Sequence, residues 1–272
     1  MEIYRDKSGT RLVYVRDGVS PEVWSSIWGA NEDWINRITK KIVRNSRPFK
    51  LVSRHTPAGG RVLEGGCGMG QFVFNLELAG FSVTGVDYAK DVVDTLNQEL
   101  PQLDVVVDDL RELNTIESSS YDTYYSGGVI EHFYDGYGEL ATQMERVLKP
   151  GGVLILTFPF MSRVRKVCAD RYAVIPDERV RDFFQFALDP DEVKRSFCEM
   201  GFIFVSDRAR NGLKGFQEAH GSSTIMRTLQ LGWGGLLGRI LRRVVGDILS
   251  VFGYGHSIEM VFRKPYLNGE NH

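Results

Sequence analysis

The chain has 272 residues, enough for one large domain with insertions around a substantial buried core. Its composition, 43% hydrophobic and 25% charged, is that of a soluble globular protein, and its net charge of −2 gives no reason to expect a nucleic-acid partner. The three cysteines are far apart and form no CxxC pair, which argues against a zinc site or a disulfide framework and favours a reducing cytoplasm. No secretion signal is expected, because the charged N-terminal stretch lacks an apolar segment of signal-peptide length.

Short apolar runs alternate with helical patterns from about residue 61 to residue 158, which is typical of a parallel sheet with crossover helices. The predicted strands are 61–65, 82–87, 104–108, 121–126 and 152–158. The predicted helices between them are 71–79, 91–100 and 137–148, and the last is expected to stop at Lys149-Pro150-Gly151-Gly152. This pattern predicts a doubly wound α/β fold.

The rest of the chain is less regular. A helix is expected to begin after Asp189, with Pro190 at its first position, and strands are expected at 201–206 and 257–263. We therefore divide the chain into an N-terminal cap segment (1–59), a core (60–207 and 257–264) and two insertions expected to shape an acceptor site (159–188 and 208–256).

A glycine-rich loop follows the first predicted core strand, in the stretch VLEGGCGMGQF (62–72). Gly66, Gly68 and Gly70 allow a tight turn whose backbone can approach a ligand closely. Asp87 ends the next strand, 21 residues after Gly66, and about 20 residues is the spacing at which an acid meets the ribose hydroxyls of a nucleoside held by such a loop. Loop, strand, helix and acid together predict a nucleoside site.

The type of nucleoside is left open by these features, since nicotinamide-dependent oxidoreductases also use a glycine turn and a downstream acid. The loop here is a compact GxGxG, unlike the GxGxxG of those enzymes. It also lacks the lysine of a triphosphate-binding GxxxxGK[ST] loop, because position 71 is glutamine.

Five motifs in order resemble those of the class I S-adenosylmethionine-dependent methyltransferases: VLEGGCGMGQF, VTGVDYA, VVVDDLREL, YDTYYSGGVIEHF and LKPGGVLILTFP. The resemblance covers about residues 60–160 closely and continues through the final strand. It implies a Rossmann-like doubly wound sheet, mostly parallel with an antiparallel final strand, with a helical N-terminal cap and insertions. It also implies S-adenosylmethionine as the cofactor.

The resemblance assigns cofactor-binding roles residue by residue. Glu64 and the three loop glycines match the loop motif, and Asp87 matches the acid that binds the ribose. Asp109 matches the acid that receives the adenine amino group, with Leu110 flanking the ring, although Asp108 is a contender because the register can slip by one residue. Ser126 and Gly127 match positions whose backbone meets the methionine part.

His132 follows the fourth core strand and is the candidate general base for a hydroxyl acceptor. Packing beside the cofactor is the alternative interpretation of this histidine. Glu131 and His132 also resemble a divalent-ion pair of quinone-pathway O-methyltransferases, but two ligands are too few to predict a metal site.

Three additions to the core are candidates for binding the acceptor. Trp24, Trp28 and Trp34 either form an aromatic lid or dock a helix. Aromatic and basic residues in 158–166 and 183–187 either contact an acceptor or cover a sheet edge. The amphipathic segment 236–252 is interpreted as a helix docked on the core, a lid, or an interfacial helix on anionic lipid.

The sequence thus predicts a cytoplasmic methyltransferase acting on a small-molecule or carrier-linked acceptor, most simply at the oxygen of a sugar, polysaccharide precursor or specialised metabolite. A quinone- or lipid-type O-methyltransferase at a membrane surface, with peripheral contact through 236–252, is the first alternative. A regulatory protein that binds S-adenosylmethionine without turnover is the second.

Overall fold

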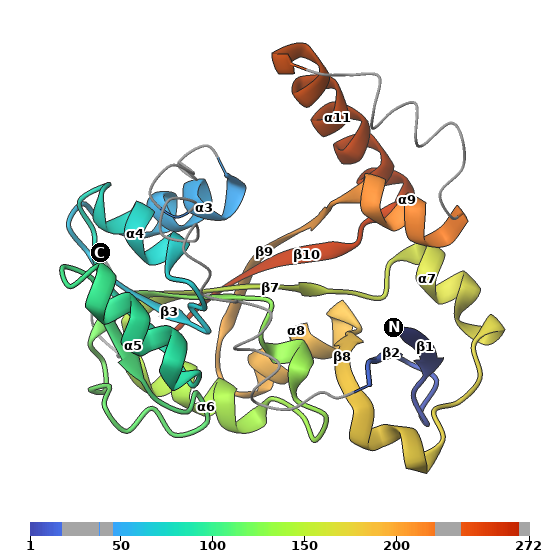
Figure 1. Ribbon diagram of the computed structural model, residues 1–272, viewed down its shortest axis with the longest axis horizontal. Coiled ribbons are helices and arrows are strands. Elements are labelled where there is room, and N and C mark those ends of the chain that lie inside the picture. The colour runs from blue at the N-terminus through green and yellow to red at the C-terminus, as the bar shows by residue number, and fades with distance from the viewer. Residues whose placement is uncertain (18–37, 39–45, 221–234, 267–272) are drawn as a thin grey trace. The chain divides into compact units, whose positions relative to one another are not determined.

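The computed structural model describes residues 1–17, 38, 46–220 and 235–266, with the backbone alone for 235–241 (Figure 1). The chain divides into two compact units. The first, which we call the core unit, comprises 18–156, 195–206 and 261–272. The other, the second unit, comprises 1–17, 157–194 and 207–260.

The main sheet has seven strands in the order β5-β4-β3-β6-β7-β10-β9. They are β3 (Arg61–Gly65), β4 (Ser82–Asp87), β5 (Asp104–Val107), β6 (Tyr121–Gly127), β7 (Leu148–Pro159), β9 (Ile203–Arg210) and β10 (Ser257–Arg263). The sheet is mostly parallel with one antiparallel strand pair, which confirms the predicted Rossmann-like fold class.

The strand order places a topological switch point between β3 and β6. From β3 the chain moves to β4 and β5 on one side, then returns to β6 on the other side of β3. Both neighbours of β3 are parallel to it, with Gly65 opposite Val86 of β4 and Ser126 of β6. Ligands of open α/β sheets bind outside the carboxyl ends of the strands at such a point.

Helices of the core unit connect and flank these strands: α3 (Arg47–His55), α4 (Gln71–Glu77), α5 (Lys90–Glu99), η1 (Ile130–His132) and α6 (Gly138–Val147). Val62, Val73 and Leu96 are fully buried between helices and sheet, and each such side chain contributes about 1.5–3 kcal/mol. The helix α6 ends at Val147, and β7 begins at the next residue, Leu148, four residues earlier than predicted. The segment Lys149-Pro150-Gly151 was expected to separate helix and strand but belongs to β7.

The second unit contains a three-stranded antiparallel sheet of β1 (Glu2–Arg5), β2 (Leu12–Val15) and β8 (Phe183–Ala187). The cap segment was expected to be helical, and α3 is, but residues 2–15 form a hairpin that we did not predict. Residues 183–187, for which an acceptor-binding role and sheet coverage were both open, form the strand that pairs with β2. The helix α8 (Pro190–Glu199) begins at Pro190 as predicted.

Helices complete the second unit: α7 (Arg163–Cys168), η2 (Ala169–Arg171), η3 (Asp177–Asp182), α9 (Gly212–His220), α11 (Gly235–Leu249) and the π-helical turn η4 (Ser250–Tyr254). A Cβ atom on Gly212 would lie 2.4 Å from the carbonyl oxygen of Gly246, and one on Gly215 would lie 1.8 Å from that of Tyr254. Only glycine therefore permits this backbone-to-backbone packing of α9 against α11 and η4. The helix predicted at 236–252 corresponds to α11, which ends at Leu249, and to part of η4; α11 packs on α9.

Candidate functional site

The glycine loop joins β3 to α4 at the switch point. Gly66, Gly68 and Gly70 have φ angles of 77°, 48° and 65°, a left-handed region that other residues adopt only with strain. A Cβ atom on Gly66 would also lie 2.5 Å from Cγ2 of Val129, which follows β6. The loop backbone is thus packed closely against the segment at the end of β6.

Asp87 at the end of β4 lies against this loop, as the sequence predicted. Its Oδ2 accepts a hydrogen bond from the Gly68 N–H at 2.8 Å and its Oδ1 accepts one from the Ala89 N–H at 3.0 Å. Burial raises the pKa of Asp87, while the backbone donors Ala89 and Gly68 oppose the rise. Each carboxylate oxygen keeps a second lone pair, which is available to a ligand hydroxyl.

Glu64 is buried near the end of β3, beside the loop. Its Oε2 has no hydrogen-bond partner in the part of the chain that the structure describes. Burial raises its pKa well above the usual range; the backbone N–H of Val73 opposes the rise and the charge of Asp87 adds to it. A buried acid in this state favours a ligand that brings positive charge or hydrogen-bond donors.

Oxygens without a partner among the described residues also occur at β6 and just after it. They belong to Tyr124, Ser126 and Glu131, all of which are buried. Glu131 lies in η1 and is 2% exposed, and burial raises its pKa to about 8. The sequence suggested only a metal-ligand role for Glu131, beside His132; the apolar Val129-Ile130 before it is the signal that could have predicted its burial.

These groups fit the cofactor that the resemblance implies. Each buried oxygen without a partner costs about 1–3 kcal/mol unless a ligand supplies a donor. Four such oxygens belong to residues of β3, of β6 and of η1 just after β6, and two of them are carboxyl oxygens. S-adenosylmethionine carries two positive groups, an ammonium and a sulfonium, so it matches an edge rich in buried acids and acceptors.

The two acids predicted at the adenine end have different partners. Asp108 Oδ2 accepts hydrogen bonds from the N–H and hydroxyl of Thr115, which commits this side chain to a turn. Asp109 forms an ion pair with Arg111 at 2.6 Å, and the hydrogen bond from Arg111 lowers its pKa. Because the Asp109–Arg111 pair is exposed, it is weak enough to exchange for a ligand donor. Leu110 beside it is buried.

The other predicted site residues lie at the end of β6. Gly127 is exposed, and a Cβ atom there would lie 2.6 Å from the Tyr125 hydroxyl oxygen. His132 is half-buried in η1, directly after Glu131. The three tryptophans proposed as a lid, Trp24, Trp28 and Trp34, lie outside the described residues. Within the described ranges, no three His, Cys, Asp or Glu residues are grouped as a metal site would require.

Known proteins resemble the core unit in sequence. A family described as "Methyltransferase domain" matches residues 63–156. The S-adenosyl-L-methionine-dependent Diels-Alderase iccD of Talaromyces variabilis is 36% identical over 103 residues, which are 35% of each chain. The ubiquinone biosynthesis O-methyltransferase of Xanthomonas axonopodis pv. citri is 29% identical over 135 residues, 47% of this chain and 56% of the relative. The matches thus span about a third to a half of these relatives' lengths.

A solved structure extends the likeness in fold. The S-adenosylmethionine-dependent methyltransferase from Archaeoglobus fulgidus superposes with a TM-score of 0.54 at 14% identity, covering 89% of this chain and 99% of that one. At this level of identity the likeness concerns the fold.

Proposed function

We propose that the chain, through its class I S-adenosylmethionine-dependent methyltransferase domain, transfers the methyl group of S-adenosylmethionine to an oxygen of a small-molecule or carrier-linked acceptor. A sugar, a polysaccharide precursor or a specialised metabolite is the acceptor class we favour. The three free cysteines, Cys67, Cys168 and Cys198, fit our proposal that the protein works in the reducing cytoplasm.

The buried acids beside the glycine loop are the observation that carries this proposal. Glu64 and Glu131 each keep a carboxyl oxygen without a partner among the described residues. A nicotinamide dinucleotide would bring its pyrophosphate charges to the loop, and these would further oppose ionisation of the two buried acids. A sulfonium nucleoside instead supplies the positive charge that this edge lacks.

In the proposed mechanism, the bound cofactor supplies an electrophilic methyl group. Asp87 would receive the ribose hydroxyls, and it also holds the loop through Gly68. Glu64 and Glu131, which are 6% and 2% exposed, would stabilise the positive charge of the cofactor, because charge interactions are strong away from water. His132 accepts the proton of an acceptor hydroxyl as the oxygen attacks, and alignment of the two reactants supplies most of the rate.

Methyl transfer is tested with S-adenosylmethionine labelled in its methyl group and a panel of hydroxylated acceptors. We expect label in the product together with S-adenosylhomocysteine, and at least a tenfold loss of rate for His132→Ala with little change in cofactor affinity. Unchanged activity in that variant would remove the general-base role. Label on no acceptor would contradict the proposed reaction.

A second candidate is cofactor binding without methyl transfer. It is favoured by the match to a relative whose name describes an S-adenosyl-L-methionine-dependent Diels-Alderase. The same assay separates the two functions, since this candidate predicts acceptor conversion or complex formation with no S-adenosylhomocysteine formed.

A membrane-surface acceptor is the third candidate. Val244, Ile248, Val251 and Phe252 of α11 and η4 are 46%, 49%, 85% and 70% exposed, and Arg243 is exposed beside them. None of the described helices is long and apolar enough to cross a membrane. An exposed apolar face with adjacent arginine suits the surface of an anionic bilayer, and the match to ubiquinone O-methyltransferases supports an apolar acceptor.

Sedimentation with phosphatidylglycerol vesicles tests this candidate, with phosphatidylcholine vesicles as the charge control. Binding should fall in a Val251→Gln, Phe252→Gln variant. Val167→Gln is the matched control, because Val167 of α7 is 75% exposed but lies on another helix. Absence of binding by the unmodified chain would eliminate the membrane candidate.

A further inference from the structure

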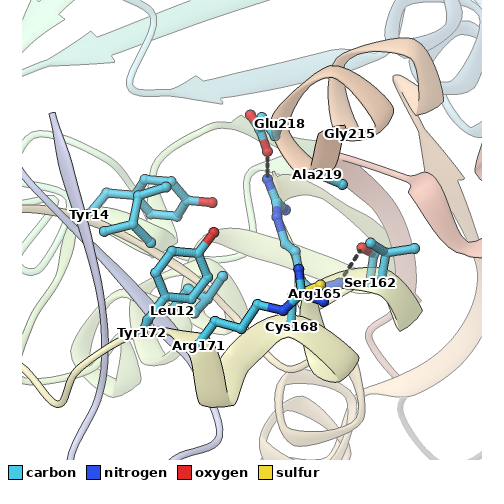
Figure 2. A pocket seen from close by; sticks show the side chains of 12 residues that line it. Leu12, Tyr14, Ser162, Arg165, Cys168, Arg171, Tyr172, Gly215, Glu218 and Ala219 are labelled. Atoms are coloured by element: carbon cyan, nitrogen blue, oxygen red, sulfur yellow. Dashed lines mark hydrogen bonds and ion pairs between the residues drawn. The ribbon is translucent and has the colours of Figure 1, made fainter. Parts of the chain in front are cut away.

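The second unit contains a cavity that the proposed function does not use. It has a volume of about 70 Å³ and lies between the β1–β2 hairpin, α7 and α9 (Figure 2). Since one water needs roughly 10–15 Å³, the cavity holds on the order of five water-sized groups. We call it the Tyr14 cavity. It suits a small molecule or one end of a larger one.

An ion pair between the buried Arg165 and the partly exposed Glu218 forms one wall of the Tyr14 cavity. Arg165 is 8% exposed and donates to Glu218 Oε2 at 2.6 Å, and its other nitrogen donates to the carbonyl oxygens of Phe160 and His256 at 2.7 and 2.8 Å. Glu218 Oε1 lies 2.8 Å from His256 Nδ1. The guanidinium is therefore fixed in place and its charge is matched by one carboxylate.

The carboxylate of this pair stays ionised. Burial acts to raise the pKa of Glu218, but the hydrogen bond from His256 and the charge of Arg165 outweigh it and lower the pKa to about 2. Burial lowers the pKa of His256 below its usual value, so the imidazole is neutral at pH 7. The wall thus presents fixed donors and acceptors with no net charge.

Two phenol groups add to the polar lining, which also includes Ser162 and the exposed Arg171. In Figure 2 the hydroxyls of Tyr14 and Tyr172 point into the same space that Arg165 and Glu218 border. Burial raises the pKa of Tyr14 to about 12, although the charge of Arg165 opposes the rise, so the phenol keeps its proton and can donate. Leu12 of β2 adds an apolar surface.

We propose that the Tyr14 cavity binds the hydroxyl-bearing part of an uncharged ligand, such as a polyol or a sugar. The carboxylate of Glu218 accepts a hydrogen bond from a ligand hydroxyl, the two phenols donate and accept, and Leu12 contacts the carbon skeleton. Arg171 is exposed and would bind an anionic ligand only weakly, whereas at the Arg165–Glu218 pair such a ligand would face the charge of Glu218 or displace it from Arg165. A neutral ligand leaves the ion pair intact.

The test is an NMR titration of the full chain with glycerol and methyl β-D-glucopyranoside as neutral probes and with acetate and inorganic phosphate as anionic ones. We expect a neutral probe to bind at least tenfold more tightly than either anion. Tyr14→Phe and Tyr172→Phe should each weaken it about fivefold, the contribution of one hydrogen bond. The matched control is Tyr4→Phe, because the Tyr4 hydroxyl donates to Glu2 at the surface of β1. Thermal melting verifies that all three variants fold.

Three results would overturn the proposal: tighter binding of an anion, no binding of either neutral probe, or neutral binding that neither cavity variant weakens. The titration measures no methyl transfer and uses no S-adenosylmethionine. Its failure would therefore leave the proposed function untouched, and failure of the methyl-transfer assay would leave the cavity proposal standing.

Discussion

In the core unit, Glu64 and Glu131 are buried with carboxyl oxygens that have no partner among the described residues, and burial raises the pKa of both. In the second unit, the buried Arg165 donates to Glu218, whose pKa falls to about 2. The acids of the core unit are more fully buried than Glu218, whose side chain is 32% exposed. The two clusters also differ in whether the chain itself supplies the opposite charge.

This difference indicates the kind of ligand each cluster accepts. A buried acid without a cation exists largely in its protonated form and gains from a positively charged ligand. An acid already paired with a buried arginine gains nothing from another charge, and stability is lost if the pair is broken. We therefore assign the sulfonium nucleoside to the core unit and an uncharged ligand to the Tyr14 cavity.

Gly66→Ala should have the largest effect on stability, because the new Cβ atom both strains the left-handed backbone and collides with Val129. The substitution lies in the core unit and leaves the Arg165 cluster unchanged. The left-handed φ and the approach of Val129 together should cost about 2–5 kcal/mol of unfolding free energy. Gly80→Ala is the matched control, since Gly80 also has a positive φ of 89° but a Cβ there would meet nothing within 4 Å. Chemical denaturation measures both, and equal losses would mean that the loop is not tightly packed.

Asp87→Asn tests the acid of the core unit that holds the loop. We expect cofactor affinity to fall by about 1.5–3 kcal/mol, the contribution of a hydrogen bond to a charged group. Asp94→Asn on the exposed face of α5 is the control and should bind as the unmodified chain does. Unchanged affinity in Asp87→Asn would contradict the placement of the ribose.

Glu218→Gln tests the paired cluster. It should cost about 2 kcal/mol of stability, less than the roughly 3–5 kcal/mol for a fully buried pair because the Glu218 side chain is 32% exposed. Asp177→Asn, which removes a surface pair with Lys7, should cost under about 0.5 kcal/mol.

The pH dependence of the same variant follows from the lowered pKa of Glu218. Its stabilisation is fully present above the ordinary pKa of 4.5 and is lost as the pH falls through about 2. Unfolding experiments across this range should therefore show the unmodified chain approaching Glu218→Gln in acid. Parallel pH profiles would contradict the ion pair.

Glu131→Gln should produce the smallest signal, a change in proton release. With its pKa near 8, Glu131 is mostly protonated at pH 7, and a bound sulfonium should lower that pKa and release up to about one proton. Calorimetry in buffers of different ionisation enthalpy measures the release, which should be reduced in Glu131→Gln and smaller with S-adenosylhomocysteine. No release from the unmodified chain would argue against a cation beside Glu131.

The sheet and the glycine loop could be predicted because their signals are local. Gly66, Gly68 and Gly70 sit between an apolar run and a helical pattern, and Asp87 follows at a fixed spacing. The β1–β2 hairpin could not be predicted in this way, since its strands are only four residues long and β2 gains a partner in β8, far along the chain.

The two sites likewise combine features with a local sequence signal and features that depend on contacts between distant residues. The Arg165 cluster joins groups that are 53 and 91 positions apart in the chain, and no periodicity connects them. The position of Glu131 just after the fourth core strand could be predicted from the sequence, but its burial depends on the packing around η1. The roles of His132, Asp109 and the other predicted cofactor ligands stay predictions until a ligand is bound.

Calorimetric titration of the unmodified chain with S-adenosylmethionine, S-adenosylhomocysteine and NAD in parallel tests the central claim most directly. We predict that both sulfur nucleosides bind, that the charged one releases more protons, and that NAD does not bind. Binding of NAD, or of neither sulfur nucleoside, would contradict the assignment of the buried acids of the core unit to S-adenosylmethionine.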